Sequence, residues 1–332
     1  MSELRWNAHL GEWVITSDVR MERTFLPPPG FCPLCPTQPG GIETEISEPD
    51  FDLVVFENRF PSLFDPPLEP AAVGTPLSPV APSRGRCEVV VYTPQHRGSF
   101  GELPLDRLFR LALVWQDRQR ELGGLEYIRY VMPFENRGRD VGVTMDHPHG
   151  QIYAFPFVPP VPDRELAVAA EHHARTGRCL QCDLLAQELA DGRRLVYQNE
   201  DFVASVPFAA RYPYEVLVAP REHREELGEL ARQELWSLMA ALQAVAQGYD
   251  ALWGEPMPYM MLFHQRPTEG GAWPGAHLHV EFHPLGRAPG KLKYRASVES
   301  GGGTFINDSL PEQKAPELRA AIERAAAGDL TP

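Results

Sequence analysis

Two halves of this chain carry the same landmarks in the same order, and this repetition limits the folds that the chain can adopt. Each half begins with a Cys-x-x-Cys pair, continues through a valine-rich segment and a helical stretch, and ends with a His-x-His pair. The cysteine pairs are Cys32/Cys35 and Cys179/Cys182, and the histidine pairs are His147/His149 and His277/His279. Such recurrence favours internal duplication. We therefore expect two related domains, residues 1–160 and 161–332.

The segments between these landmarks predict an α+β fold. The valine-rich segments, residues 88–91 and 215–218, have the composition of strands. Apolar residues then recur at helical spacing over 105–115 and 235–245. Short turns rich in Pro, Gly and Asp between consecutive strands are typical of antiparallel pairing. Each half is therefore expected to form a mainly antiparallel sheet with helices packed on it.

Composition narrows the class of protein. Of the 332 residues, 43% are hydrophobic and 23% are charged, which is enough for a large core. The net charge is −14, so the global basic field typical of nucleic-acid-binding proteins is absent. The longest apolar runs, such as residues 89–92, are strand-sized, and the first residues lack the apolar core of a signal peptide. We expect a soluble cytoplasmic protein that binds neither membrane nor nucleic acid.

The pentapeptide His147-Pro148-His149-Gly150-Gln151 carries the strongest chemical signal. In an extended segment, residues i and i+2 point the same way, so both imidazoles can face one site. The glycine lets a ligand approach the backbone, and the glutamine supplies a neutral amide. These groups suit attack of an imidazole on phosphorus, with the amide bound to a phosphoryl oxygen. Taken alone, however, a His-x-His pair is more often a surface metal site or a chance occurrence.

The cysteines point to a second kind of chemistry. Four of the five lie in the two Cys-x-x-Cys pairs. In a cytosolic chain this spacing favours metal binding or redox chemistry over structural disulfides. A thioredoxin-like motif is not expected, because Cys32 follows a proline-rich loop rather than a strand that leads into a helix.

Together these residues resemble the galactose-1-phosphate uridylyltransferase family of the histidine-triad superfamily. The resemblance covers nearly the whole chain and rests on residues 11–14, Arg20, Arg23, the first cysteine pair, residues 56–60 and 134–138, the pentapeptide, Glu165 and residues 277–279. It implies two tandem histidine-triad-like halves. It also implies exchange of UMP between UDP-glucose and galactose 1-phosphate, giving UDP-galactose, by double displacement. His149 would be uridylylated, and Gln151 would bind a phosphoryl oxygen.

The resemblance also implies metals. A structural zinc ion would be bound by Cys32, Cys35, His96 and His147, which would fix the turn that orients His149. A second site, occupied by iron or zinc, would consist of Glu165, His264, His277 and His279. The internal repeat offers a different second set, namely Cys179, Cys182 and His223 together with His277. Of these two sets, the one that contains Glu165 is favoured. A third arrangement, in which the second cysteine pair binds zinc without His277, stays open.

Substrate contacts follow from the same resemblance. The residues that match the nucleotide and phosphate pocket are Asn58, Asn136 and Thr144, and those that match the sugar-phosphate region are Lys293, Tyr294 and Glu299. Arg20 and Arg23 match arginines that reach the active site of a neighbouring subunit, which implies a homodimer with shared active sites. The match loosens near the C-terminus, where Val298 stands in place of a tyrosine and a glycine-rich segment replaces one that carries a glutamine.

Two other functions stay open at this point. One is a related adenylyltransferase or phosphorylase that acts on ADP-sugars or dinucleoside polyphosphates. Several such relatives carry Ser where Gly150 stands, so the glycine favours uridine. The other is a zinc-stabilised scaffold without catalysis, which would have no need of Gln151 after His149.

Overall fold

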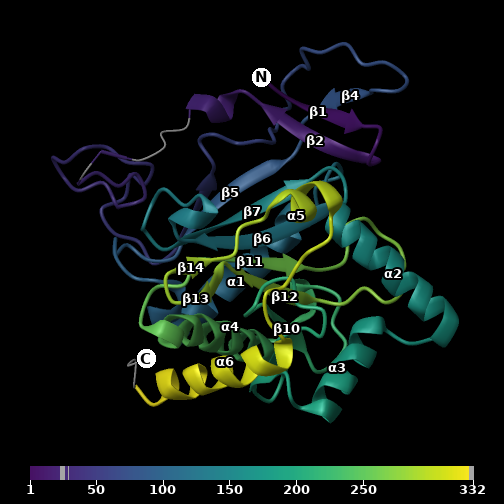
Figure 1. The fold of residues 1–332 in the computed structure, drawn as a ribbon. Helices are drawn as coiled ribbons and strands as arrows, with labels where there is room; N and C mark the ends of the chain where they lie inside the picture. Colours follow the sequence, from purple (N-terminus) through teal and green to yellow (C-terminus); the bar gives the residue numbers. More distant parts are fainter. Residues whose placement is uncertain (23–26, 29, 329–332) are drawn as a thin grey trace.

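A computed structural model describes residues 1–22, 27–28 and 30–328 of the chain. Its centre is a nine-stranded sheet in which every neighbouring pair of strands is antiparallel (Figure 1). In order across the sheet, the strands are β3 (Val54–Glu57), β5 (Arg86–Val91), β7 (His149–Phe155), β6 (Tyr130–Arg137), β11 (Tyr259–His264), β12 (His279–Pro284), β10 (Val216–Pro220), β9 (Phe202–Ser205) and β8 (Leu195–Gln198).

The two halves of the chain meet in the middle of this sheet. Strands β3, β5, β6 and β7 come from the first half and β8 to β12 from the second, and β6 pairs with β11 at the seam. Each His-x-His pair lies at the start of an inner strand, β7 in one half and β12 in the other. The predicted α+β class and antiparallel pairing are therefore confirmed. The division of the chain near residue 160 stays a prediction.

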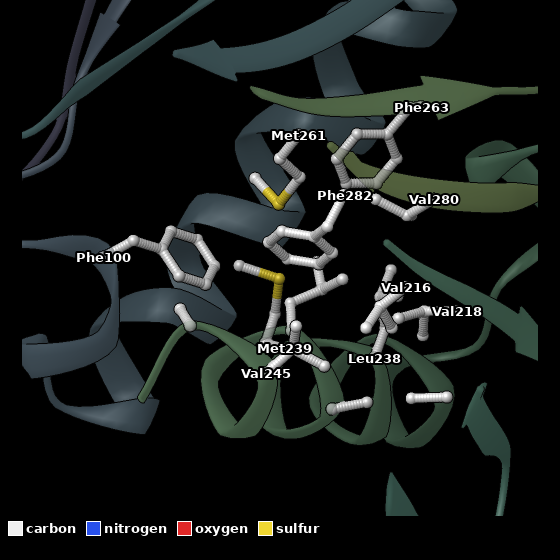
Figure 2. Packing of buried hydrophobic residues seen from close by; sticks show 14 of the residues in the cluster. Phe100, Val216, Val218, Leu238, Met239, Val245, Met261, Phe263, Val280 and Phe282 are labelled. Atoms are coloured by element: carbon white, nitrogen blue, oxygen red, sulfur yellow. The ribbon is translucent and has the colours of Figure 1, made fainter. Parts of the chain in front are cut away.

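Helices cover one face of the sheet. The long helices α1 (Leu105–Gly123) and α4 (Arg232–Trp253) pack against it, and α6 (Pro311–Ala326) packs on α4 (Figure 1). Figure 2 shows Leu238, Met239 and Val245 of α4 facing Met261 and Phe282 of the sheet. Burial of these apolar side chains, at roughly 25 cal/mol per Å², is the main force that holds the helices on the sheet.

Strand alternation divides the residues of β5 and β7 between two faces. Val90 and Ile152 belong to the helix-covered core, whereas Val89 and Val91 pack with the loops on the opposite face. In the antiparallel register, Val91 lies opposite His149 and Val89 opposite Gln151. His149 and Gln151 therefore point away from the helices, toward the loops that precede β5.

The remaining elements surround this core. They are a three-stranded sheet of β1 (Ser2–Asn7), β2 (Glu12–Ser17) and β4 (Val80–Pro82); a hairpin of β13 (Gly286–Ala288) and β14 (Lys291–Leu292); the helices α2 (Pro160–Thr176), α3 (Leu180–Asp191) and α5 (Ser297–Gly302); and the 3₁₀ turns η1 (Val19–Glu22), η2 (Phe100–Glu102), η3 (Arg139–Val141) and η4 (Leu227–Glu229). Within the described ranges, no helix is both long enough and apolar enough to cross a membrane.

Candidate active site and metal-binding clusters

His149 is the first residue of β7, and its backbone neighbour determines which ring nitrogen can react. The Nδ1 atom lies 2.7 Å from the carbonyl oxygen of His147. A carbonyl oxygen can only accept a hydrogen bond, so Nδ1 carries the proton and donates. The lone pair of the neutral ring is then on Nε2. The extended backbone between residues 147 and 149 makes this contact local, and it gives the imidazole one tautomer and one orientation.

A cavity of about 470 Å³ lies in front of His149 and Gln151. Its polar lining includes Arg20, Asn58 and Thr144, and its apolar lining includes Phe31, Phe56, Phe60, Val89 and Met145. Asn58 Nδ2 donates to Gln151 Oε1 at 3.2 Å. This bond fixes the glutamine amide, so that its NH₂ group is the end that can donate to a ligand.

The predicted substrate residues of the first half are divided between two cavities. Arg20 lines the larger cavity of its own chain, where its Nη1 donates to Ser62 Oγ at 2.9 Å and to Tyr153 Oη at 3.1 Å. Asn136 lines a second cavity of about 210 Å³ that also reaches His149. The structure thus places Arg20, Asn58, Asn136 and Thr144 in cavities that His149 also lines. Arg23 lies outside the described residues.

The predicted sugar-phosphate residues are not brought to His149. Lys293, Tyr294 and Glu299 are absent from the described residues that line the two cavities. Lys293 Nζ donates to Glu299 Oε1 at 3.2 Å and to the carbonyl oxygen of Ile306, and both charged side chains are buried. Tyr294 is 67% exposed. The sequence pattern did not reveal that the lysine and the glutamate neutralise each other within the C-terminal segment.

The first cysteine pair forms a compact cluster with two histidines. The Nδ1 atom of His147 lies 3.8 Å from Cys32 Sγ and 3.6 Å from Cys35 Sγ, and the Nδ1 atom of His96 lies 3.5 Å from Cys35 Sγ. His147 Nε2 donates to the carbonyl oxygen of Thr93 at 2.7 Å, so the lone pair on Nδ1 faces the sulfurs. Burial lowers the pKa of His147 to about 4, which keeps the ring neutral as metal binding requires.

The second cysteine pair forms a similar cluster with His223 and His277. Cys182 Sγ lies 3.6 Å from His223 Nδ1, and the two histidine rings are in edge contact with their centroids 5.1 Å apart. His277 Nδ1 donates to the carbonyl oxygen of Leu278 at 2.8 Å. Its other nitrogen, Nε2, is buried and has no hydrogen-bond partner among the described residues. Burial lowers the pKa of His277 to about 4.

A third cluster contains Glu165, His264, His279 and Glu281. Glu165 Oε2 lies 2.8 Å from His264 Nδ1 and 3.8 Å from His279 Nε2. This geometry corrects the predicted ligand set, because His277 belongs to the cysteine cluster and Glu281 takes the fourth place. The reason is the start of β12. Side chains alternate regularly only from His279 onward, so His279 and Glu281 share a face, whereas His277 precedes the strand.

Glu281 also explains how the two halves differ. The repeat aligns Glu281 with Gln151, because each lies two residues after the second histidine of its pair. This alignment is visible in the sequence, but neither predicted ligand set included Glu281. Arg211 Nη2 donates to Glu281 Oε2 at 2.7 Å, and the pKa of Glu281 is held well below its ordinary value by hydrogen bonding with His283 and by nearby His264 and Arg211. The second half therefore has an ion-paired carboxylate at the position where the first half has a neutral amide.

Comparisons with known proteins cover nearly the whole chain. The family model described as "Galactose-1-phosphate uridyl transferase, N-terminal domain" matches residues 1–159, and the model of the corresponding C-terminal domain matches residues 165–321. A galactose-1-phosphate uridylyltransferase of Thermotoga maritima is 41% identical over 96% of this chain and 98% of its own length. An ADP-glucose phosphorylase of Arabidopsis thaliana is 25% identical over 96% of this chain and 92% of its own. A solved structure of a uridylyltransferase superposes with a TM-score of 0.87 at 35% identity, covering 97% of this chain and 99% of that one.

Proposed function

The chain belongs to the galactose-1-phosphate uridylyltransferase family, and we propose that it exchanges UMP between UDP-glucose and galactose 1-phosphate through a covalent uridylyl-His149. The observation that carries this proposal is the pairing of a tautomerically fixed imidazole with an oriented amide at one cavity. The higher identity to a uridylyltransferase than to an ADP-glucose phosphorylase favours uridine over adenine.

The first half-reaction forms a phosphorus–nitrogen bond. The lone pair on His149 Nε2 attacks the α-phosphorus of UDP-glucose, and the bond from that phosphorus to the bridging oxygen breaks. Glucose 1-phosphate leaves with the electron pair. The Nδ1 proton stays hydrogen-bonded to the carbonyl oxygen of His147, which stabilises the cationic ring of the intermediate. In the second half-reaction, a phosphate oxygen of galactose 1-phosphate attacks the same phosphorus, and the imidazole leaves as the neutral base.

Stabilisation of the transferring phosphoryl group falls to Gln151 and Arg20. The NH₂ group of Gln151 can donate to a non-bridging oxygen of that phosphoryl group, because the amide oxygen already accepts a hydrogen bond from Asn58. Arg20 lies in the same cavity, where a guanidinium suits the second phosphate. The apolar lining from Phe56 and Phe60 suits the faces of the uracil ring.

We further propose zinc at both cysteine clusters. Zinc bonds of about 2.3 Å to sulfur and 2.0–2.1 Å to nitrogen imply tetrahedral S···N edges of about 3.6 Å. The S···N distances are 3.5–3.8 Å in the first cluster and 3.6 Å in the second. Zinc in the first cluster would hold the His147 ring and so the turn whose carbonyl oxygen orients His149. The Glu165 cluster offers carboxylates and imidazoles, which suit iron or zinc.

A homodimer in the cytoplasm is part of the same proposal. Lys293, Tyr294 and Glu299 lie outside the described lining of the cavities at His149, so a sugar-binding role for them requires a second copy of the chain. Arg20 already contributes to the cavity of its own chain, and its role in the reaction does not depend on the dimer.

Intact-mass measurement after brief incubation with UDP-glucose, with ADP-glucose in parallel, tests the function. We expect a gain of one UMP from UDP-glucose that disappears when galactose 1-phosphate is added. His149→Ala should remove both the adduct and the transfer with the fold retained. The matched control is His172→Ala, because His172 bonds to Asp183 on α3, away from the described lining of the cavities. Transfer by folded His149→Ala protein, or an AMP adduct from ADP-glucose alone, would contradict the proposal.

A further inference from the structure

Gly150 lies between His149 and Gln151 in the central strand β7, and its helix-side face is in close contact with a tyrosine. A Cβ atom placed on Gly150 would lie 2.1 Å from Tyr92 Oη and 3.0 Å from the carbonyl oxygen of Phe134. Both distances are shorter than ordinary van der Waals contact. The requirement for glycine at this position therefore comes mainly from the Tyr92 hydroxyl, which makes the shortest of these contacts.

Tyr92 has little freedom to move away from Gly150. Its side chain is fully buried, and its ring packs edge-on against Phe100 and Trp115, each with centroids 6.3 Å apart. The same segment supports the turn that carries the nucleophile. The backbone N–H of Tyr92 donates to the carbonyl oxygen of Pro148 at 3.1 Å, and the neighbouring Thr93 carbonyl accepts the bond from His147.

The Tyr92 hydroxyl is not explained by stability. It is buried without a hydrogen-bond partner among the described residues, as is the Oε2 atom of Glu135. The Glu135 carboxyl receives its hydrogen bond from another hydroxyl, that of Tyr259, at 2.8 Å. A buried polar group without a partner costs free energy, so phenylalanine at position 92 would avoid a cost that tyrosine incurs. The close contact with Gly150 is therefore the interaction of this hydroxyl that the described residues define.

We propose that Tyr92 is a positioning residue for uridylyl transfer, its hydroxyl packing under Gly150 to fix the backbone between His149 and Gln151. Because these two residues share one face of β7, a shift of the glycine between them moves the imidazole and the amide relative to the same phosphorus atom. A displacement of about 1 Å can lower the rate of a positioned reaction on the order of 100-fold. This role rests on the proposed function of His149.

A double-mutant cycle tests the role of Tyr92, with the rate of UMP-adduct formation from UDP-glucose as the readout. Gly150→Ala should lower this rate on the order of 100-fold. Tyr92→Phe should lower it about 10-fold with little change in KM, while the melting temperature is unchanged or higher. In the double variant, loss of Oη removes the shortest contact of the new methyl group, so its rate should recover at least about 10-fold over Gly150→Ala.

Tyr259→Phe is the matched control. It also removes a fully buried hydroxyl next to Glu135, but the three atoms nearest to a Cβ at position 150 belong to Tyr92 and Phe134 and not to Tyr259. Tyr259→Phe should not restore the rate of adduct formation when it is combined with Gly150→Ala. A wild-type rate of adduct formation for Tyr92→Phe, or a double variant no faster than Gly150→Ala, would overturn the role of Tyr92. Neither result would contradict the UMP adduct on His149. Absence of a UMP adduct on His149 of the wild-type protein after incubation with UDP-glucose would overturn the proposed function as well.

Discussion

Glu135 provides a prediction about stability whose size follows from the structure. This carboxyl is 4% exposed, and burial raises its pKa from the ordinary 4.5 to about 7, against the opposing effect of the hydrogen bond from the Tyr259 hydroxyl. Because the folded state binds this proton more tightly than the unfolded state, stability from this residue is fully present below pH 4.5. It is lost as the pH rises to about 7 and beyond.

The expected magnitude follows from the size of the shift. At about 1.4 kcal/mol for each pKa unit, ionising Glu135 costs the folded state about 3 kcal/mol above pH 7, and about 2–3 kcal/mol of this cost develops between pH 5 and pH 8. An unfolding entropy of about 2.1 cal/mol/K for each residue gives roughly 0.7 kcal/mol/K for the whole chain. The cost therefore corresponds to about 4 °C in melting temperature.

Glu135→Gln removes this ionisation and keeps an oxygen that can accept from Tyr259. The melting temperature of the variant minus that of the wild type should rise by about 4 °C between pH 5 and pH 8, measured by scanning calorimetry. Taking this difference cancels titrations common to both proteins. Glu57→Gln, which removes an exposed carboxylate from strand β3, is the control and should show no such rise. A difference for Glu135→Gln that does not depend on pH would refute the reasoning.

Two further predictions concern the metal clusters and the helix packing. Cys35→Ser and Cys182→Ser should each lose one equivalent of zinc, measured by elemental analysis. Only Cys35→Ser should slow UMP transfer, because its cluster contains His147. Equal slowing by the two variants would contradict the proposed roles. Gly248→Ala should lower the free energy of unfolding by about 1–3 kcal/mol, because the new Cβ would lie 2.3 Å from Ile322 Cγ1 at the contact between α4 and α6. Calorimetry would show this loss, and wild-type stability of Gly248→Ala would show that the helices separate without cost.

Much of the active site could be predicted because it is local in the chain. The alternation of side chains along an extended segment places His149 and Gln151 on one face, whatever the rest of the fold does. The bond from His149 Nδ1 to the His147 carbonyl likewise joins residues two positions apart. The first zinc ligands were inferred from resemblance, and the structure brings all four of them together.

Other parts of the site depend on residues far apart in the chain. Glu135 and Tyr259 meet because β6 pairs with β11 at the seam between the halves, and no local pattern predicts that pairing. Lys293 matched a substrate-binding lysine, yet its charge is neutralised by Glu299 in a segment that folds back on itself. In each case the outcome depends on which side chain is nearest after folding.

The sequence by itself determined the duplication, the α+β class and the shared face of His149 and Gln151 in β7, because periodicity and residue spacing act over a few neighbouring positions. The tertiary structure decided that His277 belongs to the second cysteine cluster, since only the packed chain shows which ligand atoms its imidazole faces. It also decided that Glu281 completes the Glu165 cluster and that Tyr92 meets Gly150. Such contacts are fixed by strand order and side-chain orientation, which arise only when both halves pack around one core.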